Sequence, residues 1–394
     1  MHRVTLHAGR EKSLRLKHPW VFSGAIATVD GAPGSGETVE LHAADGQFLA
    51  TAAWSPSSAI RARVWSFDER EAIDDAFIAG RVRASVAARA PMFDAAHTGC
   101  RLVHAESDGL PGVIADRYGE VVVVQLLNAG AEAWRDSIVA SLVDATGCSA
   151  VYERSDAEVR SLEGLPPRTG TAYGVLPQRV SFLEDHLSYG VDVAAGQKTG
   201  FFLDQRENRR RIRGLAMGRD VLDCFCYTGG FTVAALAGGA QSVLAIDSSA
   251  EALAQARDNV ARNGLDDTRC AWRDADVFAE LRKLRDSARS FDLIVLDPPK
   301  FAPTARHMEK AARAYKDINL LALKLLRPGG LLATFSCSGG MAADLFQKIV
   351  AGAALDAAAD AAIVGRFSPG ADHPIALNFP EGDYLKGLLV RKKA

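Results

Sequence analysis

The sequence predicts a multidomain protein whose last domain is α/β, with a doubly wound parallel sheet. Its 394 residues exceed the length of one ordinary domain. Short apolar–polar alternations broken by Gly and Pro fill residues 1–77, which is typical of a small β barrel. Residues 78–184 have the pattern of a small α+β domain, and strands alternate with helices through residues 185–394. We therefore expect three domains with these boundaries.

The composition is that of a globular protein, with 48% hydrophobic and 24% charged residues. No run of 18 apolar residues occurs, so no membrane partner is expected. The polar, basic start at residues 1–13 has no apolar core like that of a secretory signal, which favours a cytoplasmic protein. A formal net charge of −2 argues against blanket electrostatic binding of nucleic acid, although local basic patches remain compatible with it.

The cysteines and histidines indicate neither disulfides nor a metal. Six cysteines lie at irregular spacing, and Cys224 and Cys226 form CxC rather than CxxC. The nine histidines show no spacing typical of metal ligands, so no metal is assigned.

Turn residues separate the expected elements of the two N-terminal regions. Strands are expected at 37–41 and 47–53 in the first region. In the second, a hairpin joins 112–116 to 121–127, and a helix follows over 131–145.

The C-terminal region has the regular alternation of a parallel sheet. The predicted strands are 220–225, 242–246, 291–296 and 331–336, and the predicted helices begin near 231 or cover 250–263 and the Ala-rich run 351–362. In such sheets a ligand binds outside the carboxyl ends of the strands.

The loop after the first of these strands predicts a cofactor site. Asp223, Tyr227 and Gly229 lie there, and Asp247 ends the second strand, where an acid commonly bonds a ribose hydroxyl. The loop is not GxGxxG, and the chain has no P-loop. An adenosine cofactor without phosphate, S-adenosylmethionine (SAM), therefore fits better than a dinucleotide.

Two further side chains predict chemistry beside that cofactor. Asp297 and Cys337 follow successive strands, and neighbouring strands lie about 4.8 Å apart. Thiolate attack at C6 of a cytosine would activate C5 for methylation, and a carboxyl group near N3 would stabilise the adduct. On spacing alone, an inert, buried Cys337 remains an equal alternative.

Six segments together resemble the bacterial large-subunit ribosomal RNA cytosine-5 methyltransferases of the RlmI type, and the resemblance covers essentially the whole chain. They are GREKS at 9–13, HPWVFSG at 18–24, ESDGLPG at 106–112, KTGFFLDQR at 198–206, DPPKF at 297–301 and FSCSG at 335–339.

The resemblance implies an N-terminal PUA pseudobarrel that binds RNA, a central α+β domain and a C-terminal Rossmann-like class I SAM methyltransferase domain. It implies Cys337 as nucleophile and Asp297 as the assisting acid. It also implies 23S ribosomal RNA or the assembling large subunit as partner, and a homodimer. The implied cofactor-binding residues are Asp204, Asp223, Phe225, Tyr227, Thr228, Gly229, Asp247, Ser248, Asp276, Val277 and Asp297.

Three alternatives remain open. Methylation of a purine nitrogen would not require Cys337. A non-catalytic ribosome-assembly factor could keep a SAM pocket as a relic, and a nicotinamide-dependent dehydrogenase is disfavoured by the broken GxGxxG pattern. The basic segment 198–213 is expected to contact RNA phosphates or to form a solvated helix face.

Overall fold

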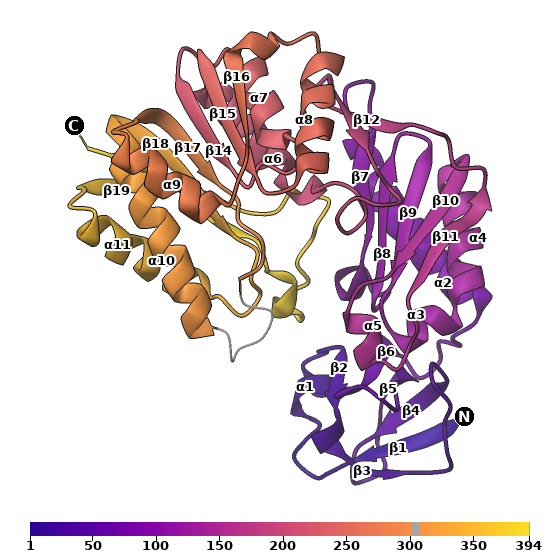
Figure 1. The fold of residues 1–394 in the computed structure, drawn as a ribbon. Coiled ribbons are helices and arrows are strands. Elements are labelled where there is room, and N and C mark those ends of the chain that lie inside the picture. Colours follow the sequence, from indigo (N-terminus) through magenta and orange to yellow (C-terminus); the bar gives the residue numbers. More distant parts are fainter. Residues whose placement is uncertain (302–307, 394) are drawn as a thin grey trace. The chain divides into compact units, whose positions relative to one another are not determined.

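The computed structural model describes residues 1–301 and 308–393 and divides into two compact units (Figure 1). One unit comprises Met1–His186, Val191–Leu203 and Ala371–Gly382, and the other comprises Leu187–Gly190, Asp204–Gly370 and Asp383–Ala394. This division into two units does not test the three domain boundaries expected from the sequence, which stay predictions. Among the described residues, none of the helices combines the length and the hydropathy of a membrane span.

A six-stranded sheet forms the N-terminal part of the first unit, in the order β2-β6-β5-β4-β1-β3. Its strands are β1 His2–Leu6, β2 Trp20–Phe22, β3 Ile26–Val29, β4 Thr38–His42, β5 Phe48–Trp54 and β6 Ile60–Ser66, with helix α1 at Lys12–Arg15. Val4, Leu41 and Ala52 are fully buried in its core. The strands expected at 37–41 and 47–53 are confirmed as β4 and β5.

A five-stranded sheet follows in the order β11-β10-β9-β8-β7. Its elements are α2 Asp75–Arg89, β7 Gly99–His104, β8 Val113–Tyr118, β9 Val121–Leu126, α3 Ala129–Ala133, α4 Arg135–Thr146, β10 Ala150–Ser155, α5 Val159–Leu162 and β11 Arg168–Gly174. The expected hairpin is confirmed, because β8 and β9 pair antiparallel. The helix expected at 131–145 is two helices, α3 and α4, and Asn128 caps the first by accepting from the Ala131 N–H.

The second unit contains a seven-stranded sheet in the order β16-β15-β14-β17-β18-β20-β19. Its strands are β14 Asp220–Cys224, β15 Ser242–Asp247, β16 Cys270–Asp274, β17 Phe291–Leu296, β18 Leu326–Ser336, β19 Ala361–Phe367 and β20 Lys386–Lys392; the short pair β12 Val180–Glu184 and β13 Leu187–Val191 precedes it. The expectation of a wholly parallel sheet is wrong at one edge. There β20 pairs antiparallel with both β18 and β19, because no helical crossover joins β19 to β20.

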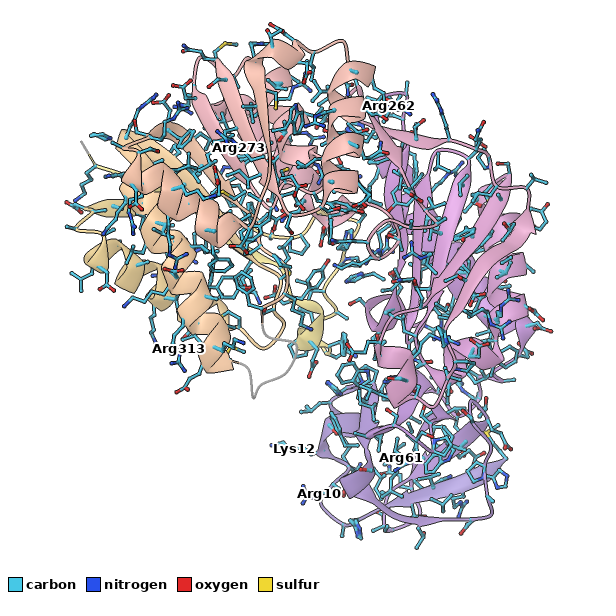
Figure 2. All side chains as sticks on the ribbon, viewed as in Figure 1. Arg10, Lys12, Arg61, Arg262, Arg273 and Arg313 are labelled. Carbon is cyan, nitrogen blue, oxygen red and sulfur yellow. The ribbon has the colours of Figure 1, made fainter. Side chains whose placement is uncertain are left out.

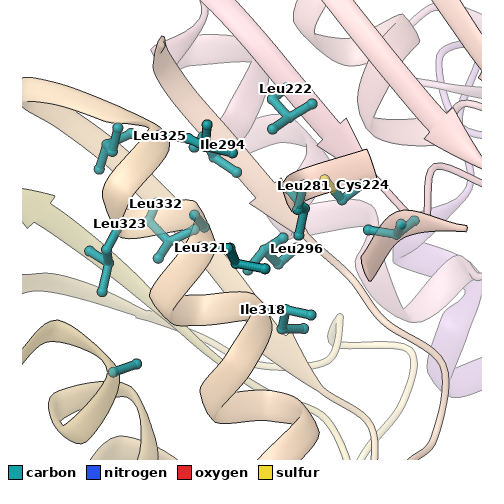
Figure 3. Packing of buried hydrophobic residues seen from close by; sticks show 14 of the residues in the cluster. Leu222, Cys224, Leu281, Ile294, Leu296, Ile318, Leu321, Leu323, Leu325 and Leu332 are labelled. Atoms are coloured by element: carbon teal, nitrogen blue, oxygen red, sulfur yellow. The ribbon is translucent and has the colours of Figure 1, made fainter. Parts of the chain in front are cut away.

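Helices cover both faces of this sheet (Figure 1). They are α6 Arg206–Leu215, α7 Gly230–Ala237 and α8 Ala250–Arg262 on one face, and α9 Val277–Asp286, α10 Met308–Leu325 and α11 Ala343–Asp356 on the other. Figure 3 shows Leu222, Ile294 and Leu296 of the strands packed with Leu281 of α9 and Ile318 of α10. This packing fixes the strands whose carboxyl ends carry the candidate site.

The Ala-rich run 351–362 is only partly helical. Helix α11 ends at Asp356, and Ala361 already pairs with Lys392 as the first residue of β19. Helix propensity is a weak preference, and strand pairing overrides it here.

A buried carboxylate joins the two sheets of the first unit. Glu163 accepts hydrogen bonds from Ser55 Oγ at 2.8 Å, Arg63 Nη1 at 2.8 Å and the Ala129 N–H at 3.3 Å. Glu163 and Arg63 are both buried, so each charge depends on the other for solvation.

Replacing Glu163 by Ala should therefore lower the free energy of unfolding by about 3 kcal/mol, because buried Arg63 would lose its closest counter-ion and keep only Glu106, whose Oε1 lies 3.9 Å from Arg63 Nε. Urea denaturation measures this. The matched control is Asp144→Ala, which removes an exposed ion pair to Arg83 and should change the free energy of unfolding by less than about 0.5 kcal/mol. Equal losses in the two variants would contradict the assignment.

Candidate active site

The loop between β14 and α7 has an unusual backbone. Phe225, Tyr227 and Gly229 all have positive φ, at 61°, 48° and 79°. Such values are uncommon for residues other than glycine and are held in place only by surrounding structure. Gly229 is required for a second reason, since a Cβ there would lie 2.8 Å from Ala256 Cβ of α8. The loop is therefore pressed against α8 in one shaped conformation.

Buried polar atoms of this loop are left for a ligand. The Asp223 carboxyl group is buried, and its Oδ2 accepts from Thr232 Oγ1 at 2.7 Å. Its Oδ1 and the Thr228 hydroxyl are buried and make no hydrogen bond to the described residues. Buried polar atoms without partners are rare, so these two fit a bound molecule that carries an ammonium or hydroxyl group. Burial, with the Asp247 charge added, raises the pKa of Asp223 to about 7.

Asp247 holds the same loop from the end of β15. Its Oδ2 accepts from the Tyr227 N–H at 2.8 Å and its Oδ1 from the Ser249 N–H at 3.0 Å. Ser248 is exposed beside it. Asp247 therefore fixes the backbone of the loop between β14 and α7, and its contact with a ribose stays a prediction.

Asp276 and Val277 have local structural roles. Asp276 is exposed and caps α9, where its Oδ1 accepts from the Ala279 N–H at 2.8 Å. Val277 is buried in the core between the sheet and α9. Their contact with a cofactor stays a prediction.

Asp204 is buried in the short helical turn before α6. Tyr384 Oη donates to its Oδ2 at 2.6 Å, and its backbone carbonyl accepts from the Gly370 N–H at 2.9 Å. The segment before β20 thus holds Asp204, a contact between residues that are distant in the sequence.

Asp297, directly after β17, is half-buried and is held by a chain of two side-chain hydrogen bonds. Gln205 Nε2 donates to its Oδ1 at 3.0 Å, and Asn208 Nδ2 donates to Gln205 Oε1 at 2.6 Å. Burial, with the charges of Asp204 and Asp223 added, raises the pKa of Asp297 to about 7. The sequence reasoning missed Gln205, although it stands inside the 198–206 motif.

Cys337 directly follows β18 and is half-buried. Strands β17 and β18 are parallel neighbours, as the sequence predicts. Cys337 Sγ lies 3.8 Å from the carbonyl oxygen of Pro298, which follows Asp297. The thiol and the carboxyl group are therefore carried by adjoining loops at the carboxyl ends of β17 and β18.

The basic segment 198–213 is only partly available to RNA. Lys198 is exposed, whereas Arg206 and Arg209 are buried. Arg210 pairs with Glu207, and Arg211 donates to the Arg366 carbonyl. Helix α6 thus turns two of the segment's arginines into the protein, so a solvated face cannot include them, and contact of the remaining basic residues with RNA stays a prediction.

The raised pKa of Asp297 predicts a pH-dependent cost to stability. Between about pH 4 and pH 7 the folded protein retains a proton that the unfolded chain has lost, so stability falls as the pH rises through this range. Asp297→Asn should therefore raise the midpoint of thermal unfolding at pH 8 by roughly 2–4 °C, and by less at pH 5. Asp258→Asn, on the exposed face of α8, is the control and should show no such difference. An equal effect of Asp297→Asn at both pH values would contradict the prediction.

Solved structures show the same fold over nearly the whole chain. A protein from Streptococcus mutans assigned as a SAM-dependent methyltransferase has a TM-score of 0.86 at 23% identity, covering 99% of this chain and 100% of that one. The crystal structure of SMU.776, complexed with SAH, has a TM-score of 0.87 at 24% identity and the same coverage.

Sequence relatives are closer. Proteins named ribosomal RNA large subunit methyltransferase I from Shewanella denitrificans and Shewanella amazonensis are each 51% identical, over 99% of this chain and of theirs. The relative of the same name from Pseudoalteromonas translucida is 49% identical over 98% of both chains. The S-adenosylmethionine-dependent methyltransferase family matches residues 174–373, and the PUA-like domain family matches residues 4–67. The expected PUA-like and SAM methyltransferase domains are thereby confirmed, and the chain belongs to the S-adenosylmethionine-dependent methyltransferases that carry an N-terminal PUA-like domain.

Proposed function

We propose that this protein methylates C5 of a cytosine in 23S ribosomal RNA through a covalent bond between Cys337 and C6. The observation that carries the proposal is the pairing of a thiol with a carboxyl group on adjoining loops. Cys337 Sγ lies 3.8 Å from the Pro298 carbonyl, one residue beyond Asp297. The relatives named ribosomal RNA large subunit methyltransferase I support ribosomal RNA as the substrate.

The cofactor supplies an electrophilic methyl group, and the loop after β14 supplies the groups that would hold it. Asp223 and Thr228 offer buried polar atoms, and the Asp247 carboxylate suits ribose hydroxyls. We retain as further contacts Asp204, Phe225, Tyr227, Gly229, Ser248, Asp276, Val277 and Asp297.

Cys337 and Asp297 divide the chemistry on the base. Attack of the Cys337 thiolate forms the S–C6 bond and moves the π electrons of the C5–C6 double bond towards C5, which becomes the nucleophile for the methyl group. Because its pKa is about 7, Asp297 is protonated in a large fraction of molecules near neutral pH and can donate to N3 of the base. A base, which Asp297, a water or another residue could supply, then takes the C5 proton, the thiolate departs to restore the C5–C6 double bond, and N3 gives up its proton.

The N-terminal sheet offers a surface for the RNA backbone. Arg10 and Lys12, both labelled in Figure 2, are exposed beside α1, as are Arg15 and Lys17. Lysine and arginine side chains on such a surface bind phosphates without reading sequence. We propose naked 23S ribosomal RNA or the assembling large subunit as the substrate. We also propose a homodimer, which rests on the family resemblance alone.

Cys337→Ala should abolish methyl transfer while leaving SAM binding intact, because Cys337 attacks the base and is not among the cofactor contacts. The measurement is mass spectrometry of nucleosides from unmodified ribosomal RNA incubated with SAM and protein, with SAM affinity from calorimetry. Cys270→Ala is the matched control, since Cys270 lies on the edge strand β16, which β15, β14 and β17 separate from β18.

Formation of 5-methylcytidine by the unchanged protein and by Cys270→Ala, but not by Cys337→Ala, would support the proposal. Full activity of Cys337→Ala would overturn the covalent mechanism. A methylated purine would overturn the choice of cytosine, and SAM binding without any methylation of ribosomal RNA would favour an RNA-binding assembly factor.

Asp247→Ala should weaken SAM binding about 5- to 150-fold, which corresponds to the loss of roughly 1–3 kcal/mol in hydrogen bonds to a charged group. Isothermal calorimetry measures the dissociation constant. Asp258→Ala on the exposed face of α8 should bind SAM as the unchanged protein does. Unchanged affinity in Asp247→Ala would refute the assignment of Asp247 to the ribose.

A further inference from the structure

A buried lysine lies behind the loop that carries Cys337. Lys386 begins β20, and its partner across the antiparallel ladder is Ser336, the residue before Cys337. The residue is 9% exposed. The ammonium donates to the carbonyl oxygens of Ser338 at 3.1 Å and Met341 at 2.7 Å. Lys386 therefore holds the backbone immediately after the thiol.

The charge of Lys386 interacts with Cys337. Burial lowers the pKa of Lys386, and attraction to Asp383 and to the Cys337 thiolate acts in the opposite direction. This attraction is mutual, so the same ammonium favours the charged form of Cys337. A cationic neighbour is one of the recurring means by which proteins make a cysteine reactive.

Helix α10 supports the same loop from another side. Tyr315 is fully buried, and its hydroxyl accepts from Ser336 Oγ at 3.0 Å and shares a hydrogen bond with Ser338 Oγ at 3.2 Å. The Tyr315 hydroxyl thus bonds the side chains of Ser336 and Ser338, the residues on both sides of Cys337. Tyr315 on α10 and Lys386 on β20 interact electrostatically with the thiol, Asp383 attracts Lys386, and Asp297 lies on the adjoining loop.

We infer that Lys386 is a positioning residue whose buried ammonium orders the loop after Cys337 and favours the Cys337 thiolate. The inference rests on the proposed function, in which Cys337 is the nucleophile. A buried charge carries a desolvation cost, and two backbone carbonyls alone would be satisfied equally well by uncharged donors. One of the two carbonyls that Lys386 binds belongs to Ser338, the residue after Cys337, so the ammonium is held next to the thiol-bearing loop.

The chain offers a matched control on the same strand. Lys392 ends β20 and also donates to two backbone carbonyls, Leu323 at 3.0 Å and Leu326 at 2.8 Å. Burial lowers its pKa as well. Six residues along a strand place it on the same face of the sheet as Lys386, about 20 Å away. Lys392 is half-buried, and comparing Lys386→Met with Lys392→Met separates the charge near Cys337 from the general cost of losing a lysine that bonds two backbone carbonyls.

The test is the pH dependence of alkylation by iodoacetamide, followed for each cysteine-containing peptide by mass spectrometry. In Lys386→Met the midpoint of the Cys337 profile should move to higher pH by about one unit, and the rate at pH 7 should fall up to about tenfold. Lys392→Met should leave that profile unchanged. Burial raises the pKa of Cys270, which lies about four strand spacings (about 19 Å) from β18, so Cys270 should stay unreactive over this pH range in every variant that folds.

Two more variants separate charge from hydrogen bonding. Lys386→Gln keeps N–H donors without the charge and should shift the midpoint as Lys386→Met does; it also serves if the methionine variant fails to fold. Lys386→Arg keeps the charge and should retain the midpoint. A Cys337 profile in Lys386→Met and Lys386→Gln that matches Lys392→Met would overturn the inference.

This experiment needs neither RNA nor SAM. A shifted alkylation profile together with an active Cys337→Ala would refute the proposed function while the influence of Lys386 on the thiol stands. An unshifted profile together with an inactive Cys337→Ala would refute the role of Lys386 alone. The two failures are therefore distinguishable.

Discussion

The candidate site depends on the parallel alignment of four adjacent strands. In β15, β14, β17 and β18 the ladder pairs Ile246 with Cys224, Cys224 with Leu296 and Leu296 with Thr334, so the strands end at one level. The chain leaves each strand within a few residues of that level and carries Asp247, Asp297 or Cys337 with it. Helices pack against both faces and hold the register. Without this common level, Asp247 and Cys337, which are 90 positions apart, could not share one site.

The carboxyl groups of Asp204 and Asp223 interact with that of Asp297 in the protein interior near the ends of these strands. Asp204 and Asp223 are buried, and their charges add to the effect of burial on Asp297. Crowded carboxyl groups oppose one another's ionisation, which costs folding stability at neutral pH. The outcome is a carboxylic acid that holds its proton near pH 7, a state that an isolated aspartate at the surface does not reach. Gln205 and Asn208 then fix the direction in which that acid points.

Local patterns in the sequence were sufficient for β14, β15, β17 and β18 and for the residues that follow them, but they did not predict β16, β19 or β20. Strand β17 has the predicted bounds, and the adjacency of β17 and β18 is confirmed. The supporting contacts were out of reach, because Gln205–Asp297, Asp204–Tyr384 and Ser338–Lys386 join residues far apart in the chain. Two of them depend on the antiparallel edge around β20, which alternation of strands and helices does not predict. Burial of Arg206 and Arg209 likewise follows from packing of α6 and not from its charge.

The acid and the thiol are supported by different elements, and this separation has a chemical consequence. Asp297 is held from the start of α6 in surroundings rich in negative charge, which favour its neutral form. Cys337 is held from β20 and α10, where the Lys386 ammonium favours a negative thiolate. Covalent catalysis on a cytosine requires both states at one pH, a protonated acid and an ionised thiol. Placing the two groups on neighbouring strands with separate supports allows both states within one small region, because neither support has to serve the other group.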